Sequence, residues 1–351
     1  MYFYTRKIMK GGNPMLRYDE FYYQDIVERF GYKFCNEMTD LLPGFSFDEM
    51  QNWLCGYNLN TEVIHGISKE NTLIILGVGT NHEPHIGTIS QILRGIYFQK
   101  RGYKVQIILG DIDSYSSRSS SITSVTKNVE KYANFVKNLG FDANFGTIRN
   151  QLDHAEIMKT AFLISPKVQD EDFQDVEESI YQYYEKLGIY SGMSFAVKQA
   201  ILLMFSDFIH EGFVGNYKNI IVLSGIDEHP YVPKANDIAG RLDLDVNICG
   251  LFSSIIRGLN GQPKMSKSLR GSSITAGMTE REIIKIITRL PEEAVNHNDS
   301  IAYQLMCHVL LYDNKTLNTL AKHCDSDPVM WAKDKVDFAH DLSLICEKWD
   351  K

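Results

Sequence analysis

The run Thr72-Leu-Ile-Ile-Leu-Gly-Val-Gly79 is apolar almost throughout and ends in glycines. Such a run is typical of a strand buried on both faces of a parallel sheet. The turn at 80–84 leads into 89–100, which has the helical period, and 105–109 is a second apolar run. The order predicts a βαβ unit, whose crossover is expected to be right-handed.

The same pattern continues further along the chain. Residues 219–223 and 246–251 predict two more strands, joined by a helix at about 232–241. Residues 126–139 and 191–210 predict helices between the two strand pairs. The intervening stretch 152–185 is also predicted to be helical. Strands that alternate with helices indicate an α/β fold with a doubly wound parallel sheet, Rossmann-like and of the HUP type.

Both ends of the chain are predicted to be helical. Residues 22–35 carry apolar side chains at helical spacing, and 47–54 is a second short helix that Ser46 would cap. From Thr279 the chain is expected to be helical to its end. These patterns predict three domains, listed here in order: a helical N-terminal extension at 1–70, a catalytic core at 71–275 and a helical C-terminal domain at 276–351.

Bulk composition limits the possible partners. The 351 residues carry a formal net charge of −8, which argues against broad electrostatic binding to nucleic acid or to anionic membranes. No apolar run is long enough for a transmembrane helix, and the N-terminus lacks the features of a secretory signal. The six cysteines are scattered without a CxxC pair, which favours reduced thiols in the cytoplasm over a zinc or disulfide site. No resident metal site is predicted.

Lys264-Met265-Ser266-Lys267-Ser268 lies in a loop rich in glycine and proline, after the last predicted strand. Lysine supplies a point charge to phosphate oxygens without a fixed planar geometry. Two lysines on such a loop suit chemistry in which a polyphosphate gains charge and then leaves.

Further polar residues and glycines cluster at predicted strand ends. Gly77 and Gly79 would let the backbone approach a ligand closely, and the helix that opens at Gly87 would point free N–H groups at that ligand. His85 stands just before this helix and could donate to a phosphate oxygen. Because ligands of doubly wound sheets bind at the carboxyl ends of the strands, these residues are expected to share one site.

The motifs resemble the signature pair of class I aminoacyl-tRNA synthetases. His85-Ile86-Gly87-Thr88 stands where that class has HIGH, and residues 264–268 spell KMSKS in full. Within the class, the chain is similar to the tryptophanyl-tRNA synthetase branch in its eukaryotic and archaeal form. The stretches that carry this similarity are 26–31, 45–50, 194–200, 225–231, 237–242 and 272–274.

The resemblance implies that ATP activates an amino acid, which is then transferred to the 3′-end of tRNA. His85 would stabilise charge on the α-phosphate, and Lys264 and Lys267 would hold the departing β- and γ-phosphates with Mg²⁺. Positioning and charge stabilisation would dominate such a reaction. The resemblance also implies a homodimer. The remaining residues assigned to the ATP site are Gly77, Gly79, Gly87, Thr88, Asp227, Met265, Ser266 and Ser268.

The amino-acid pocket is assigned by alignment with the same branch. Tyr115 falls on the tyrosine that recognises the indole, Gln199 falls on a glutamine of the pocket, and Glu228 lies beside it. In three places the chain departs from the family pattern. Thr88 replaces the second histidine of HIGH, Glu228-His229 stands where the branch has Gln-Asp, and Asn236 replaces an arginine before Asp237.

Three functions remain open on sequence grounds. One is a tryptophan–tRNA ligase. A second is a paralogue that forms an aminoacyl-adenylate for a non-translational acceptor or a specialised tRNA. The third is an inactive synthetase fold that serves as a binding protein. The stretch 296–351 favours the second, because it carries six lysines and no arginine against nine acidic residues, whereas binding to tRNA relies on neutralising phosphates. The intact pair of lysines argues against the third.

Overall fold

The computed structural model describes residues 20–34, 42–58, 66–117, 121–174, 181–188, 192–290 and 296–351. Within these ranges six strands form one sheet in the order β1-β6-β5-β2-β3-β4. The strands are β1 (Leu54–Tyr57), β2 (Thr72–Gly79), β3 (Lys104–Gly110), β4 (Gly146–Asn150), β5 (Asn219–Gly225) and β6 (Asn247–Ser253). All neighbouring pairs are parallel except β1 with β6.

The sheet is doubly wound, as predicted. Strand β2 lies between β3 and β5, so the chain leaves β2 towards one edge and later returns on its other side. Gly79 is paired with Gly110, and Gly225 with Ser253, which aligns the carboxyl ends of the strands along one edge of the sheet. The switch point between β2 and β5 is where such a fold binds its ligand.

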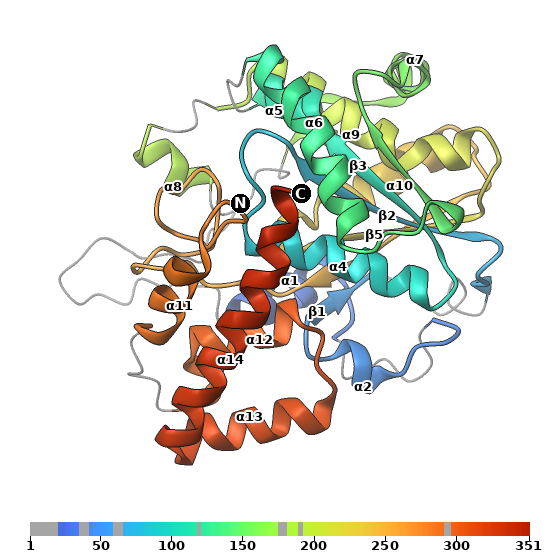
Figure 1. The fold of residues 1–351 in the computed structure, drawn as a ribbon. Helices are drawn as coiled ribbons and strands as arrows, with labels where there is room; N and C mark the ends of the chain where they lie inside the picture. The colour runs from blue at the N-terminus through green and yellow to red at the C-terminus, as the bar shows by residue number, and fades with distance from the viewer. Residues whose placement is uncertain are drawn as a thin grey trace.

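Helices cover both faces of the sheet, as Figure 1 shows. Ile74 and Leu76 of β2 belong to the hydrophobic cluster that includes α4 and α6, whereas Leu73 and Ile75 belong to the cluster that includes α9 and α10. The alternation follows from the two-residue period of a strand. The helices that precede the C-terminal part of the chain are α1 (Glu20–Phe30), α2 (Phe47–Met50), α4 (Ile86–Lys100), α5 (Asp111–Ser117), α6 (Ile122–Asn138), α7 (Ala155–Ile164), α8 (Tyr181–Lys186), α9 (Phe195–Phe213) and α10 (Tyr231–Arg241).

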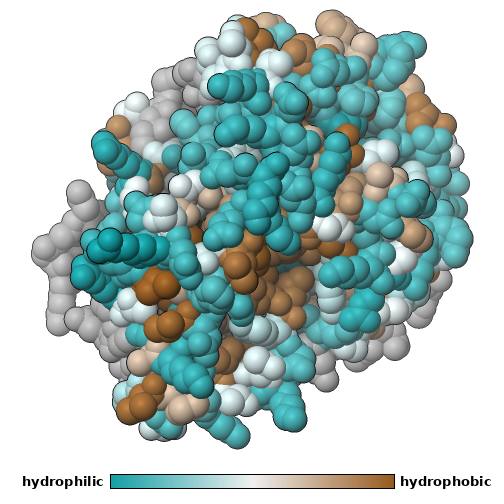
Figure 2. Space-filling model, viewed as in Figure 1, coloured by the Kyte–Doolittle hydropathy of each residue, from teal (hydrophilic) through white to brown (hydrophobic). Residues whose placement is uncertain are grey.

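The C-terminal part of the chain is helical, as predicted. Its elements are α11 (Glu280–Thr288), α12 (Ile301–Val309), α13 (Asn314–Ser326), α14 (Pro328–Cys346) and the 3₁₀ turn η7 (Glu347–Trp349). Thr279 caps α11 with a capping box that includes Glu282. Hydrophobic residues gather near the middle of the face drawn in Figure 2, between the sheet-containing half and these lower helices. The helices share their hydrophobic cluster with α4 and α6.

Several predicted elements need correction. The helix predicted at 47–54 ends at Met50, and Leu54 begins β1, which pairs antiparallel with β6. Residues 54–57 form a strand because the edge of β6 offers them backbone hydrogen bonds. The sequence pattern of these four residues alone cannot reveal that pairing. The helix predicted at 22–35 ends at Phe30, because Gly31 adopts a φ of +66°, the left-handed conformation that ends many helices. Cys35 lies outside the described residues.

The stretch 152–185 is less helical than predicted. Helix α7 begins only at Ala155, and 3₁₀ turns follow it at Ser165–Lys167 and Asp170–Phe173 before α8. Helix α9 begins at Phe195 after Ser194, whose side chain accepts from the N–H of Val197, so the predicted start at Ser191 is too early. The three domain boundaries stay predictions. Strand β1 nevertheless makes part of the 1–70 extension a strand of the core sheet.

Candidate active site

A cavity of about 230 Å³ lies at the carboxyl ends of β2 and β5. It brings together both motifs that the sequence singled out. The lining residues that the sequence had assigned to catalysis or to ATP are Gly77, Gly79, His85, Gly87, Thr88, Asp227, Lys264, Met265, Ser266, Lys267 and Ser268. Glu228, assigned to the amino-acid site, also lines it.

His85 is the N-cap of α4. Its Nδ1 accepts a hydrogen bond from the backbone N–H of Thr88 at 3.3 Å. A Cβ on Gly87 would lie 2.7 Å from Cε1 of His85, so the ring can fold over the helix end only because residue 87 is glycine. Burial, and then the nearby Lys267 and Lys264, lower the pKa of His85 to about 3. The ring is therefore neutral at physiological pH, with Nε2 left as its N–H donor.

Backbone pairing holds the two motifs together. His85 forms an isolated antiparallel bridge with Thr275, which follows the lysine loop. The N–H of Ile86 donates to the carbonyl of Ile274 at 3.1 Å, and the N–H of Ala276 donates to that of Pro84 at 2.9 Å. The far end of the loop is thereby fixed beside the start of α4.

Other residues of the 264–268 loop shape it. The N–H of Met265 donates to the carbonyl of Ile256 at 3.0 Å, and the Met265 side chain is buried. Ser266 is bonded to Ser272 through both its N–H and its carbonyl, at 3.0 and 2.9 Å. The hydroxyl of Tyr184, on α8, lies 2.8 Å from that of Ser266. These contacts leave the two lysine side chains to face the cavity.

The two lysines have different partners. Nζ of Lys264 lies 2.5 Å from a carboxylate oxygen of Asp227, which follows β5. Nζ of Lys267 donates to the carbonyl of Gly79 and, at 2.9 Å, to the hydroxyl of Tyr132. Asp227 is thus the ionic partner of Lys264 in this structure. The cavity combines a helix start with one neutral donor and two ammonium groups, an arrangement that suits a polyphosphate.

Two residues assigned to the amino-acid pocket lie outside this cavity. Tyr115 on α5 is 49% exposed, and Gln199 on α9 is also exposed. Asp113 and Ser114, the neighbours of Tyr115, line the cavity instead. The hydroxyl of Ser114 accepts from the N–H of Thr80 at 2.9 Å, which ties α5 to the end of β2. The roles of Tyr115 and Gln199 stay predictions.

Sequence reasoning missed a cationic group in the cavity wall. Arg94, two turns after Gly87 on α4, donates from Nη2 to Nδ1 of His308 on α12 at 2.6 Å. Nε2 of His308 lies 2.9 Å from the hydroxyl of Ser254. Burial lowers the pKa of Arg94 to about 9. Burial, and then the nearby Arg94, lower the pKa of His308 well below its usual value. Residues seven apart on a helix lie on the same face, so the position of Arg94 relative to Gly87 could have indicated that Arg94 faces the same site.

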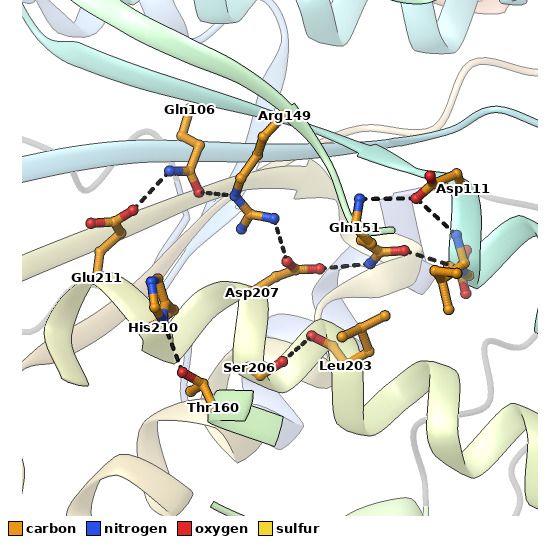
Figure 3. Close-up of polar contacts among 12 residues, drawn as sticks. Gln106, Asp111, Arg149, Gln151, Thr160, Leu203, Ser206, Asp207, His210 and Glu211 are labelled. Atoms are coloured by element: carbon orange, nitrogen blue, oxygen red, sulfur yellow. Dashed lines mark hydrogen bonds and ion pairs between the residues drawn. The ribbon is translucent and has the colours of Figure 1, made fainter. Parts of the chain in front are cut away.

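A buried polar network joins β4, α9 and the start of α5 (Figure 3). Arg149 on β4 donates to Asp207 on α9 at 2.7 Å, and Gln151 donates to the other oxygen of Asp207 at 2.7 Å. Gln151 also accepts from the N–H of Asp113 and donates from its own N–H to Asp111. Burial raises the pKa of Asp207, a shift that Arg149 opposes. The network thereby fixes the position of α5, the helix that places Asp113 in the wall of the cavity.

A doubly wound sheet that presents a helix-start histidine and two loop lysines at its carboxyl edge defines the catalytic core of a class I aminoacyl-tRNA synthetase. The sequence model of the family described as tRNA synthetases class I (W and Y) matches residues 68–341, and the chain belongs to this family. Enzymes of this family use ATP as a substrate.

Curated relatives have low sequence identity. The chain is 23% identical to the tryptophan–tRNA ligase of Methanocaldococcus jannaschii, over 91% of this chain and 90% of that protein. It is 21% identical to tryptophan–tRNA ligase 1 of Halobacterium salinarum, over 62% of this chain, and the match spans only 41% of that relative's length.

Solved structures confirm the fold. The tryptophanyl-tRNA synthetase of Aeropyrum pernix superposes with a TM-score of 0.77 at 18% identity, over 93% of this chain and 92% of that one. The tryptophanyl-tRNA synthetase of Giardia lamblia has a TM-score of 0.72 at 18% identity, over 94% and 92%. A tyrosyl-tRNA synthetase from Archaeoglobus fulgidus has a TM-score of 0.64 at 16% identity, over 80% and 89%.

Proposed function

We propose that this protein is a tryptophan–tRNA ligase. In its first step the tryptophan carboxylate attacks the α-phosphorus of ATP, and in its second the tryptophanyl group passes to the terminal ribose of tRNA. The observation that carries the proposal is the convergence of His85, Lys264 and Lys267 on one cavity at the start of α4. The relatives named above, which are tryptophan–tRNA ligases, support the choice of amino acid.

The first step places charge where this cavity has donors. A carboxylate oxygen bonds to the α-phosphorus as the bond to the bridging oxygen breaks, and that electron pair leaves with pyrophosphate. Nε2–H of the neutral His85 and the N–H of Gly87, at the start of α4, would donate to the α-phosphate oxygens. Lys267 and Lys264 would stabilise the charge that gathers on pyrophosphate.

Lys264 must exchange its partner during this step. In the structure its ammonium group is paired with Asp227. A triphosphate carries more negative charge than one carboxylate, so ATP would draw Lys264 away from Asp227, and release of pyrophosphate would restore the pair. Asp227 would in turn become free to accept from the nucleotide.

Mg²⁺ would neutralise part of the charge on the triphosphate. In nucleotide sites it is held largely by substrate phosphates and water, with one or two carboxylates. Among the described residues no cluster of three or more His, Cys, Asp or Glu side chains could hold a metal ion. We propose that Mg²⁺ enters with ATP, with Asp227 as the nearest candidate carboxylate once Lys264 has moved.

Recognition of the amino acid is proposed to involve Glu228, Tyr115 and Gln199. Glu228 lines the cavity and could accept from the indole N–H or from the α-ammonium group. Tyr115 and Gln199 are proposed from the resemblance alone. A buried polar group that a wrong ligand leaves unpaired costs about 1–3 kcal/mol. Even one such acceptor would therefore favour tryptophan over amino acids that cannot donate to it.

Pyrophosphate exchange into ATP, measured with each of the twenty amino acids, tests the activation step. Exchange that depends on tryptophan supports the proposal. Exchange with a different amino acid would reject the specificity, and exchange with none would reject synthetase activity in favour of a binding protein.

A second candidate is an aminoacyl-adenylate enzyme with a non-translational acceptor or a specialised tRNA. The charge of residues 296–351 favours it, because six lysines and no arginine face nine acidic residues, a poor surface for phosphate contacts. Acylation of total tRNA separates the two candidates. Adenylate formation without acylated tRNA would eliminate the ligase, whereas charged tRNA would eliminate a non-tRNA acceptor.

We further propose that the protein works as a homodimer in the cytoplasm. The exposed side chains of Ile122 on α6 and of Phe162 and Leu163 on α7 provide apolar surface on the core for such contacts. None of the described helices is both long and apolar enough to cross a bilayer. Analytical ultracentrifugation tests the dimer, and a purely monomeric species would reject it.

A further inference from the structure

Lys267 depends for its position on residues outside its own loop. Its ammonium group donates to the carbonyl of Gly79 and, at 2.9 Å, to the hydroxyl of Tyr132. The same nitrogen lies 5.2 Å from the centre of the Tyr132 ring. Tyr132 belongs to α6, a helix of the sheet layer, and is fully buried. A flexible four-carbon side chain is therefore directed by a rigid element.

The hydroxyl of Tyr132 has one available orientation. It donates to the carbonyl of His82 at 2.7 Å, which leaves its oxygen free to accept from Lys267. Burial, and then the nearby Glu83, raise the pKa of Tyr132 well above its usual value, so the group stays a neutral phenol. A neutral partner holds the ammonium group without cancelling its charge, whereas Asp227 pairs Lys264 with a carboxylate.

Trp349, in η7 after the last helix, holds the Tyr132 ring in turn. The indole meets the ring of Tyr132 edge-on, with centroids 5.0 Å apart, and that of Phe135 at 5.5 Å. It is 5% exposed. The side chain of Asn138 donates to the carbonyl of Lys348 at 3.1 Å, which fastens η7 to the end of α6. Trp349 is therefore a packing residue.

We propose that Tyr132 is a positioning residue for Lys267 and that Trp349, from the helical C-terminal domain, holds Tyr132 in place. The catalytic lysine is thereby coupled to the C-terminal domain through one tyrosine. This inference rests on the proposed function, because it assumes that Lys267 stabilises the departing pyrophosphate.

Tyr132→Phe tests the first link, because it removes the hydroxyl and keeps the ring. We expect kcat for pyrophosphate exchange to fall about 10-fold while KM for ATP changes less than about 2-fold, the pattern of an interaction made in the transition state. The Kd for magnesium pyrophosphate, measured by calorimetry, should rise by a similar factor.

A double-mutant cycle separates positioning from general packing. In a Lys267→Ala background, Tyr132→Phe should change the exchange rate and the pyrophosphate Kd by less than about 2-fold, because Tyr132 acts through Lys267. Equal losses in both backgrounds would overturn the inference, as would a Tyr132→Phe protein with wild-type values. The pyrophosphate measurement needs no amino acid, so a protein that binds pyrophosphate and shows no exchange would reject the proposed function alone.

Trp349 is tested by replacement with phenylalanine and alanine. Trp349→Ala should lower exchange about 3-fold in the wild-type background and not in the Lys267→Ala background, with Trp349→Phe in between. Trp331→Phe is the matched control, since Trp331 is equally buried in α14, and it should leave exchange unchanged. Loss of exchange in the control equal to that in Trp349→Phe would overturn the second link.

Discussion

Two cationic side chains of the core, one buried behind α5 and β4 packing and one in the cavity, are held in different ways. Arg149 lies on β4, 6% exposed, with Asp207 as its carboxylate and Gln106 as a further partner at 3.0 Å. Lys267 lies in the cavity and contacts a carbonyl and a hydroxyl. A buried charge without a counter-ion is costly, so a structural cation keeps an internal one. For Lys267, which we propose contacts the substrate, the carbonyl of Gly79 and the hydroxyl of Tyr132 are partners that a phosphate oxygen could replace.

Removal of the counter-ion should have the largest effect. Asp207→Ala leaves Arg149 buried without a carboxylate, which costs about 3–5 kcal/mol of unfolding free energy. Urea denaturation measures it. Asp207→Asn is the control that keeps the hydrogen-bonding shape, and it should cost less than Asp207→Ala. A loss below about 1 kcal/mol for Asp207→Ala, typical of a surface ion pair, would remove the distinction between Arg149 and Lys267.

Removal of the substrate-facing cation should change rate and not stability. Lys267→Ala is expected to lower the exchange rate at least about 100-fold, because the charge on pyrophosphate loses its donor. The unfolding midpoint in urea should stay near that of the wild type. Lys315→Ala, on the exposed face of α13, is the matched control for removal of a lysine. Near-normal exchange in Lys267→Ala would deny it a role in the reaction.

Gly87→Ala tests the close approach of His85 to α4. The added Cβ would lie 2.7 Å from Cε1 of His85, so the ring must move. Because alanine favours a helix, we expect stability to change by less than about 1 kcal/mol, while KM for ATP rises about 10-fold through loss of a charge-directed hydrogen bond. Gly240→Ala is the control, since its added Cβ would have no atom within 4 Å apart from the neighbouring backbone of its own helix. An unchanged KM in Gly87→Ala would mean that the His85 ring does not pack against residue 87 when ATP binds.

A further effect should come from the titration of His85. Its folded pKa is about 3, below the unfolded value of about 6.5. The unfolded chain therefore gains a proton first, and the contribution of His85 to stability falls as pH drops from about 6.5 towards 3. Unfolding free energies at pH 8 and pH 5 should show a larger loss for the wild type than for His85→Gln. Equal losses would mean that the ring is not held neutral.

Most of the sheet and one wall of the site were predictable. The apolar runs at 72–79, 105–109 and 219–223 became β2, β3 and β5 because a strand buried on both faces needs apolar residues at every position. Strand β1 was not predictable, because its four residues are strand only through pairing with β6. The spacing of apolar residues within a short segment carries no information about a partner strand about two hundred residues away in the sequence.

The sequence alone determined the chemical groups and the loops on which they stand: a histidine before a helix, glycines at strand ends and two lysines in a short loop. Tertiary structure decided which groups those residues meet. The pairing of Lys264 with Asp227, the bond from Lys267 to Tyr132 and the contact of Tyr132 with Trp349 join segments far apart in the chain. Hydrogen bonds and packing act over a few ångströms, and only the folded backbone sets those distances.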